Sequence, residues 1–129
     1  MGDNILDTNR EFETRELVRK WLISEGQWNL EANLDQLTNL EGGFVDRFNF
    51  FMPYLPETAK DSILISGCSI GSEHIVASRF GFNEVYGTEV EQSLVDIATF
   101  RLSDYSNFFV SHYDGLNLPF PDLSFSFVY

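Results

Sequence analysis

A glycine turn between an apolar run and a helical pattern is the feature of this sequence best suited to hold a ligand. Residues 63–65 form an apolar run rich in β-branched residues, as expected for a strand buried on both faces of a parallel sheet. The turn 67–71 follows, with glycine at both ends, and a helical pattern begins at Ser72. Such a turn lets a backbone approach a nucleotide-like ligand closely. An ordinary tight connection between strand and helix explains the same residues equally well.

Glu89 is the second residue that could bind a ligand, because it follows the predicted strand 84–88 directly. It lies 22 residues after Gly67, and a ribose-binding carboxylate is expected about 20 residues beyond such a turn. One carboxylate accepts hydrogen bonds from two neighbouring hydroxyl groups at once. The position at a strand end therefore favours a sugar-binding role over that of a solvated loop glutamate.

The third candidate is the run Asp114-Gly115-Leu116, which follows the predicted strand 107–112. A carboxylate here could accept a hydrogen bond from an exocyclic amine such as that of adenine, and Gly115 lets the chain turn close to a flat ring. Taken alone, the pair is more simply a common Asp-Gly turn. Its place in series with the other two candidates favours ligand binding.

The periodicity predicts two parts of the chain. Residues 1–59 are expected to form a helical extension, with helices at 11–25, 27–41 and 44–55. Residues 60–129 are expected to form a ligand-binding domain with strands at 62–66, 84–88, 107–112 and 125–129 and helices at 72–80 and 91–102. This alternation implies an α/β fold with a parallel, doubly wound sheet. Because a central-looking strand ends the sequence, we expect a piece of a longer protein.

Two helices of the extension are expected to bury one face each. On the first, the predicted face carries Phe12, Leu17, Val18, Trp21 and Leu22. On the third, it carries Phe44, Phe48, Phe51 and Leu55. With 13 phenylalanines in 129 residues, the core should be rich in Phe.

The charge balance argues against nucleic acid and anionic membranes as partners. The formal net charge is −12, and from Asp61 onward two arginines face nine acidic residues. The single cysteine, Cys68, fits a reducing, cytoplasmic location, and no stretch reads as a signal peptide or membrane span. His74 and His112 lie 38 residues apart without metal-ligand spacing, so we expect no metal site.

Three motifs together resemble the class I, Rossmann-like S-adenosylmethionine-dependent methyltransferases. They are Ile-Ser-Gly-Cys-Ser-Ile-Gly-Ser at 65–72, Tyr-Gly-Thr-Glu-Val-Glu at 86–91 and Tyr-Asp-Gly-Leu-Asn-Leu-Pro-Phe-Pro-Asp-Leu-Ser-Phe-Ser-Phe-Val at 113–128. Within the last, residues 118–122 are similar to the family's lead into its fourth strand. The resemblance covers about residues 60–129. It implies a Rossmann-like parallel sheet that is truncated after its fourth strand, with S-adenosylmethionine as the cofactor.

The resemblance also assigns roles to residues. The glycine turn would face the methionine moiety, Glu89 would bind the ribose, Val90 would pack on adenine, and residues 114–116 would contact the adenine edge. The cofactor-binding residues so implied are Gly67, Cys68, Ser69, Gly71, Glu89, Val90, Asp114, Gly115 and Leu116. No catalytic residue is implied, and the methyl acceptor stays unknown.

The sequence departs from the family pattern at three positions. Ile65 replaces an acidic residue before the turn, Ser69 replaces the middle glycine, and Ser126 replaces an acidic residue in the fourth strand. Serine fits the middle position if its φ is negative. These replacements keep open a non-catalytic remnant or interaction module of the same fold.

A dinucleotide-binding domain for NAD(P) or FAD is the other alternative. Its fingerprint places glycine at the first, third and sixth positions of the turn, where only Gly67 of the residues 67, 69 and 72 matches. The methyltransferase pattern places glycine at the first, third and fifth positions, and Gly67 and Gly71 match it. The glycine spacing therefore favours methyl transfer.

Overall fold

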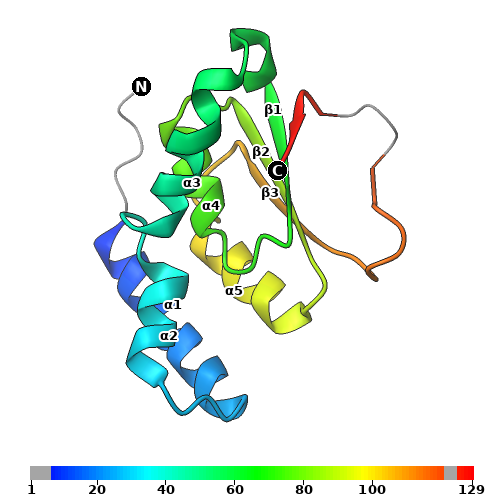
Figure 1. Ribbon diagram of the computed structural model, residues 1–129. Coiled ribbons are helices and arrows are strands. Elements are labelled where there is room, and N and C mark those ends of the chain that lie inside the picture. Colours follow the sequence, from blue (N-terminus) through cyan, green and yellow to red (C-terminus); the bar gives the residue numbers. More distant parts are fainter. Residues whose placement is uncertain (1–6, 121–124) are drawn as a thin grey trace.

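The structure is a computed structural model that describes residues 7–120 and 125–129 (Figure 1). The extension forms α1 (Thr8–Ser24), α2 (Leu30–Thr38) and α3 (Gly43–Phe51), with 3-10 turns at Met52–Tyr54 and Glu57–Lys60. The remaining elements are β1 (Ser62–Ser66), α4 (Ser72–Arg79), β2 (Glu84–Glu89), α5 (Gln92–Arg101), β3 (Phe108–His112) and β4 (Phe127–Val128). Every expected element is therefore present in the expected order.

Element ends differ from the expected ones where local chemistry interrupts a pattern. The third helix ends at Phe51 rather than at residue 55, because Pro53 has no N–H group and the chain tightens into a 3-10 turn. Gly26 takes a φ of 74° just past α1, as expected for a helix stop. Strand β4 is shorter than the predicted 125–129. Pro121 and Asp122 of the family-like run lie outside the described residues.

The four strands form one parallel sheet with the order β3-β2-β1-β4. Ser66 of β1 pairs with Thr88 of β2, and Glu89 of β2 pairs with His112 of β3. The carboxyl ends of these three strands therefore lie side by side at one edge of the sheet. This confirms the parallel α/β arrangement that the alternation of elements predicted.

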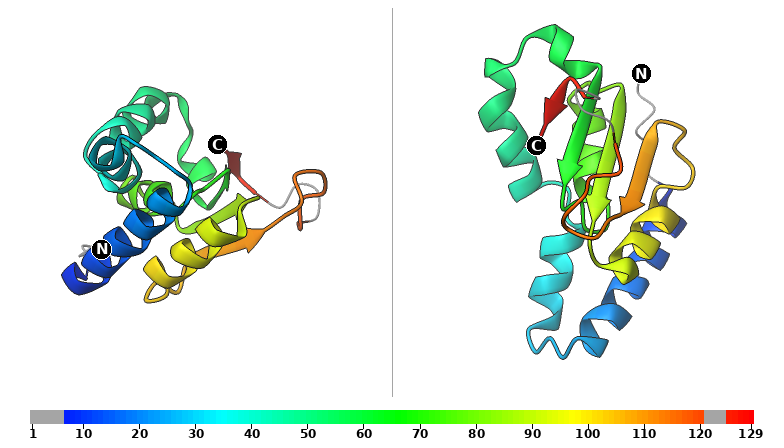
Figure 2. Two further views of the ribbon diagram at one scale, coloured as in Figure 1. Left: turned by 90° about the horizontal axis from the view of Figure 1, so that it is seen from below. Right: turned by 90° about the vertical axis from the view of Figure 1, so that its right-hand side faces the viewer.

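The described helices cover one face of this sheet (Figure 2). The chain moves from β1 to β2 to β3 in one direction, so crossovers of the same hand place α4 and α5 on the same side. The connection from β3 to β4 runs back the other way, and Phe120 and Phe125 from it pack edge-on against Tyr86 on the opposite face. The described residues thus show one half of a doubly wound arrangement.

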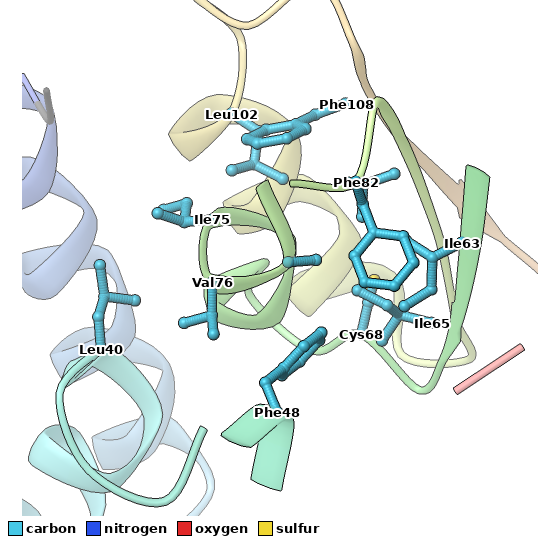
Figure 3. Packing of buried hydrophobic residues seen from close by; sticks show 12 residues of the cluster. Leu40, Phe48, Ile63, Ile65, Cys68, Ile75, Val76, Phe82, Leu102 and Phe108 are labelled. Atoms are coloured by element: carbon cyan, nitrogen blue, oxygen red, sulfur yellow. The ribbon is translucent and has the colours of Figure 1, made fainter. Parts of the chain in front are cut away.

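Two hydrophobic clusters join the extension to the rest of the fold. In the larger one, Phe48 of α3 packs against Phe82, with ring centroids 6.3 Å apart, beside Ile63 and Ile65 of β1 (Figure 3). The second cluster combines residues of α1, α2, the glycine turn and α5: Val18, Leu22, Leu34, Ile70, Leu94 and Ile97. Since both clusters cross the boundary at residue 60, the two predicted parts share their cores.

The buried face predicted for the first helix is partly wrong. Phe12 is 65% exposed and Leu17 is also exposed, whereas Thr14, Val18 and Leu22 are buried. The last three follow one another at intervals of four residues, so they form the single stripe that faces α2 and α5. Phe12 and Leu17 lie on either side of that stripe. On α3, Phe48 is fully buried while Phe44 and Phe51 pack around it, as expected.

Candidate functional site

The glycine turn between β1 and α4 is built from left-handed backbone. Gly67 has a φ of 73° and Gly71 a φ of 83°. A Cβ atom on Gly71 would lie 2.7 Å from Cδ1 of Leu102, so both conformation and space require glycine there. Next to Gly67 the space that a Cβ atom would fill is empty, as a ligand-binding turn requires. The turn is fixed to β2 by a hydrogen bond from Cys68 N to Thr88 O of 2.9 Å.

Ser69 corrects one expectation about this turn. Its φ is 51°, a left-handed value, and not the negative value at which a serine fits this position without strain. Its backbone N–H donates to Oε1 of Glu89 at 2.9 Å, so a contact from another strand holds the serine in this conformation. The left-handed region costs about 1–2 kcal/mol per residue for side chains with a Cβ atom.

Replacing Ser69 with glycine should therefore stabilise the protein. We expect the free energy of unfolding to rise by about 0.5–1 kcal/mol, because the relieved strain exceeds the greater entropy of an unfolded glycine. Chemical denaturation of Ser69→Gly measures this change, with Ser93→Gly on the exposed side of α5 as a control that should destabilise. A loss of stability in Ser69→Gly would show that the serine is not strained.

Glu89 connects the turn after β1 to the loop after β2. Its side chain is buried, and its two carboxylate oxygens accept from Ser69 N at 2.9 Å and from Glu91 N at 3.0 Å. Each oxygen of an ionised carboxylate has a second lone pair. The carboxylate can thus hold the turn and still accept hydrogen bonds from a ligand at the sheet edge. Whether it binds a ribose stays a prediction.

The loops after β2 and β3 also contact each other. Tyr113 N donates to Glu89 O at 3.2 Å, and Nε2 of His112 lies 3.0 Å from Val90 O. Val90 is exposed, and a Cβ atom on Gly115 would lie 3.7 Å from its Cγ1 atom. Val90 and Gly115 are therefore neighbours. The exposed side chain of Val90 offers an apolar surface on which a flat ring could pack.

Asp114 forms the Asp-Gly turn that was the simpler interpretation of this pair in the sequence. Its Oδ1 atom accepts from Leu116 N and from Asn117 N, each at 2.8 Å. These backbone N–H groups of Asn117 and Leu116 lower the pKa of the carboxyl group. Leu116 is 87% exposed. A contact of Asp114 with adenine is neither supported nor contradicted by this turn, and it remains a prediction.

Cys68 and His74 lie beneath β2 and do not reach solvent. Burial, together with the nearby Glu89 carboxylate, raises the pKa of the Cys68 thiol to about 12, so the group stays protonated and is a poor nucleophile. His74 is fully buried, and its Nε2 lies 3.0 Å from Phe109 O. Since a carbonyl only accepts, Nε2 carries the proton. Nδ1 has no hydrogen-bond partner among the described residues.

Stability should fall in mild acid because of His74. Burial lowers the pKa of its imidazole from 6.5 to about 4, since protonating Nδ1 would place an unpaired N–H in an apolar site. The unfolded chain therefore binds a proton at higher pH than the folded one. This contribution to the free energy of unfolding is present above about pH 6.5 and lost toward pH 4, by about 2 kcal/mol between pH 7 and 5.

Denaturation curves at pH 7 and 5 for the protein and for His74→Gln measure this loss. The other titrating groups are the same in both chains, so the difference between their pH dependences belongs to His74. A His74→Gln chain whose stability falls as steeply as that of the parent would contradict the assignment. His112→Gln, at an exposed position of β3, is the control.

A pocket beside the turn was missed by the sequence analysis. It has a volume of about 430 Å³ and lies between α2, α3 and Ser69. Its lining residues are Ala32, Asp35, Gln36, Leu37, Asn39, Gly42, Gly43, Phe44, Arg47 and Ser69. The volume falls in the usual range of small-molecule sites. The only signal in the sequence is Gly42-Gly43 between the second and third predicted helices, and two glycines that interrupt a helical pattern do not by themselves indicate the wall of a pocket.

Neither a cluster of metal ligands nor a membrane-spanning helix occurs within residues 7–120 and 125–129. No three side chains of His, Cys, Asp or Glu come together in these ranges in a way that could hold a metal ion. No helix of the same ranges is long and apolar enough to cross a lipid bilayer.

Comparison with known proteins gives structural likeness only. No protein-family model and no curated protein matches the sequence. The structure is similar to an S-adenosylmethionine-dependent methyltransferase from Mesorhizobium loti, with a TM-score of 0.55 and 23% identity over 70% of this chain and 40% of the other. It is similar to the YcgJ protein from Bacillus subtilis, with a TM-score of 0.53 and 20% identity over 64% and 36%.

The chain thus spans less than half the length of these two solved structures. At such identities the likeness concerns the fold. The parallel sheet with the order β3-β2-β1-β4 and these likenesses show that the chain has the α/β fold of the class I, Rossmann-like S-adenosylmethionine-dependent methyltransferases.

Proposed function

We propose that the chain is the cofactor-binding part of an S-adenosylmethionine-dependent methyltransferase. The observation that carries the proposal is the contact between Glu89 and the turn after β1, with Oε1 of Glu89 2.9 Å from Ser69 N. This contact joins the carboxyl ends of two neighbouring strands in a parallel sheet, where ligands of open α/β folds bind. It leaves a carboxylate beside a glycine turn with open space at Gly67.

The proposed cofactor lies along this edge of the sheet. Its ribose hydroxyls would donate to Glu89, and its adenine would lie over Val90 and Gly115, whose positions next to each other support this placement. The adenine edge would meet the backbone at Leu116 and the carboxylate of Asp114. The methionine end would lie at the turn formed by Gly67, Cys68, Ser69 and Gly71, next to the pocket lined by α2 and α3.

When bound, S-adenosylmethionine would supply an electrophilic methyl group on a sulfonium. The chain's own task is then to orient the donor and to exclude water from the edge of the sheet. Glu89 fixes the turn, and the left-handed glycines bring the backbone within reach of the ligand. We assign no general base to this chain.

The charge of the chain does not favour a nucleic acid as the acceptor. Among the described residues, each arginine lies in an ion pair with a carboxylate, which leaves these arginines poorly placed to bind phosphates. The net charge of −12 repels polyanions as well. We further propose a cytoplasmic location, because the single cysteine is free and buried.

Isothermal titration with S-adenosylhomocysteine tests the proposal, after circular dichroism has verified folding. We expect saturable heat with S-adenosylhomocysteine and none with NADH. Weaker binding of 5′-methylthioadenosine, which lacks the amino acid, would support the placement of the methionine end at the turn. Binding of NADH alone would favour the dinucleotide alternative. A folded chain that binds none of the three would favour a non-catalytic remnant and overturn the proposal.

A further inference from the structure

A single buried arginine connects the helical extension to the glycine turn. Arg101, at the end of α5, has a fully buried side chain, the largest such side chain among the described residues. Its Nε and Nη2 atoms donate to the two carboxylate oxygens of Glu11 on α1, at 3.0 and 2.8 Å. Such bidentate pairs fix geometry as well as contributing energy. One side of the guanidinium is thus occupied by the extension.

The other side of the same guanidinium holds the turn. Its Nη1 atom donates to Oγ of Ser72 at 2.6 Å and to Ile70 O at 3.3 Å, and these two residues flank Gly71. The Ser72 hydroxyl in turn donates to Leu37 O on α2 at 2.6 Å. The three nitrogen atoms of the Arg101 guanidinium therefore all donate either to α1 or to the segment 70–72. Ser72 then links this segment to α2.

Packing reinforces this connection. Ile70 of the turn packs in one cluster with Val18 and Leu22 of α1. Leu102, the residue after Arg101, lies against Gly71 so closely that no Cβ atom fits there. The turn is therefore held from two directions: Glu89 bonds it from β2, and Arg101 bonds it from α5, where Glu11 of the extension holds the guanidinium.

We propose that Arg101 is a positioning residue for the cofactor turn and that the extension acts on the cofactor site through the Glu11–Arg101–Ser72 network. This inference rests on the proposed function for its effect on binding. A lysine could not perform the task, because it lacks the planar fork that reaches Glu11 and Ser72 at once. The extension then contributes to the binding site indirectly, through Arg101.

A double-mutant cycle on the whole chain tests the network. Glu11→Gln keeps the shape of the side chain and removes its charge, and Ser72→Ala removes the hydroxyl without touching the ion pair. We expect the Kd for S-adenosylhomocysteine to rise about tenfold in Glu11→Gln and about fivefold in Ser72→Ala. Since both act through Arg101, the double variant should lose about tenfold rather than the roughly 50-fold product of independent effects.

Glu13→Gln, the same chemical change at an exposed position of α1, is the matched control and should leave the Kd unchanged. An unchanged Kd in folded Glu11→Gln would overturn the proposal, as would a double variant that reaches the full product. If the parent chain itself does not bind S-adenosylhomocysteine, the proposed function fails, and a second measurement then decides the inference.

That measurement is native-state hydrogen exchange, which needs no ligand. The Ser69 and Gly71 amides are bonded to Glu89 and to Cys68 O. In Glu11→Gln we expect these two amides to exchange faster, by a factor larger than that of the β1 and β2 amides. A uniform acceleration across the sheet would mean that Glu11 and Arg101 only stabilise the fold, and it would overturn the positioning role.

Discussion

Replacing Glu89 with alanine is expected to weaken binding of S-adenosylhomocysteine by roughly 10- to 150-fold, or about 1.5–3 kcal/mol. Removing the carboxylate removes the proposed hydrogen bonds to the ribose. It also leaves the N–H groups of Ser69 and Glu91 without the acceptor that they bond at 2.9 and 3.0 Å. Two part-buried donors that lose this partner should lower the free energy of unfolding by about 1–2 kcal/mol. Titration calorimetry and chemical denaturation measure the two effects.

The matched control for this change is Glu84→Ala. Glu84 begins the same strand, β2, but lies exposed at the opposite edge of the sheet. Glu84→Ala should leave the affinity for S-adenosylhomocysteine unchanged. An unchanged affinity shows that the loss of one negative charge does not by itself weaken binding. Glu89→Gln adds a second comparison, because it keeps the size of the side chain in a site that is closely packed. If the folded Glu89→Ala chain bound S-adenosylhomocysteine with the affinity of the parent, Glu89 would not be part of the cofactor site.

The sequence predicted the edge of the sheet well because that edge follows from short-range signals. The apolar run 63–65 and the glycine turn predicted β1 and the start of α4 at their observed residues. In a parallel sheet the carboxyl ends of neighbouring strands lie together, so the order of the strands was enough to bring Glu89 near the turn. To predict that Glu89 lies near the turn, the parallel pairing of the strands was the only tertiary feature required.

The failures have a common cause, which is contact between residues far apart in the sequence. The positive φ of Ser69 depends on its hydrogen bond to Glu89, 20 residues away. The pair of Glu11 and Arg101 joins residues 90 apart, and no periodicity points to it. The face of α1 was wrong for the same reason, since an amphipathic pattern does not show which stripe α5 will cover. Local patterns predict elements, while long-range polar contacts decide the details of a site.

Adding one methyl group at Gly87 should strongly destabilise the protein. A Cβ atom there would lie 2.6 Å from Sγ of Cys68 and closer still to Cε1 of His74. Neither neighbour can move easily, because both are buried and His74 is hydrogen-bonded to Phe109 O. The backbone at Gly87 is itself paired on both sides, with Ile65 and Val110. We expect Gly87→Ala to lower the free energy of unfolding by about 3 kcal/mol or more.

Gly43→Ala is the control for this change, because it adds the same methyl group at the start of α3, where the nearest atom is Nη1 of Arg47 at 3.6 Å. It should alter stability by less than about 1 kcal/mol. Chemical denaturation compares the two. Because Cys68 belongs to the turn, any structure that accommodates the methyl group added by Gly87→Ala must push the turn away from β2 and stretch its hydrogen bond to Thr88. Folded Gly87→Ala should thus also bind S-adenosylhomocysteine more weakly, and a chain with parental stability and affinity would show that the packing beneath β2 does not hold the turn in place.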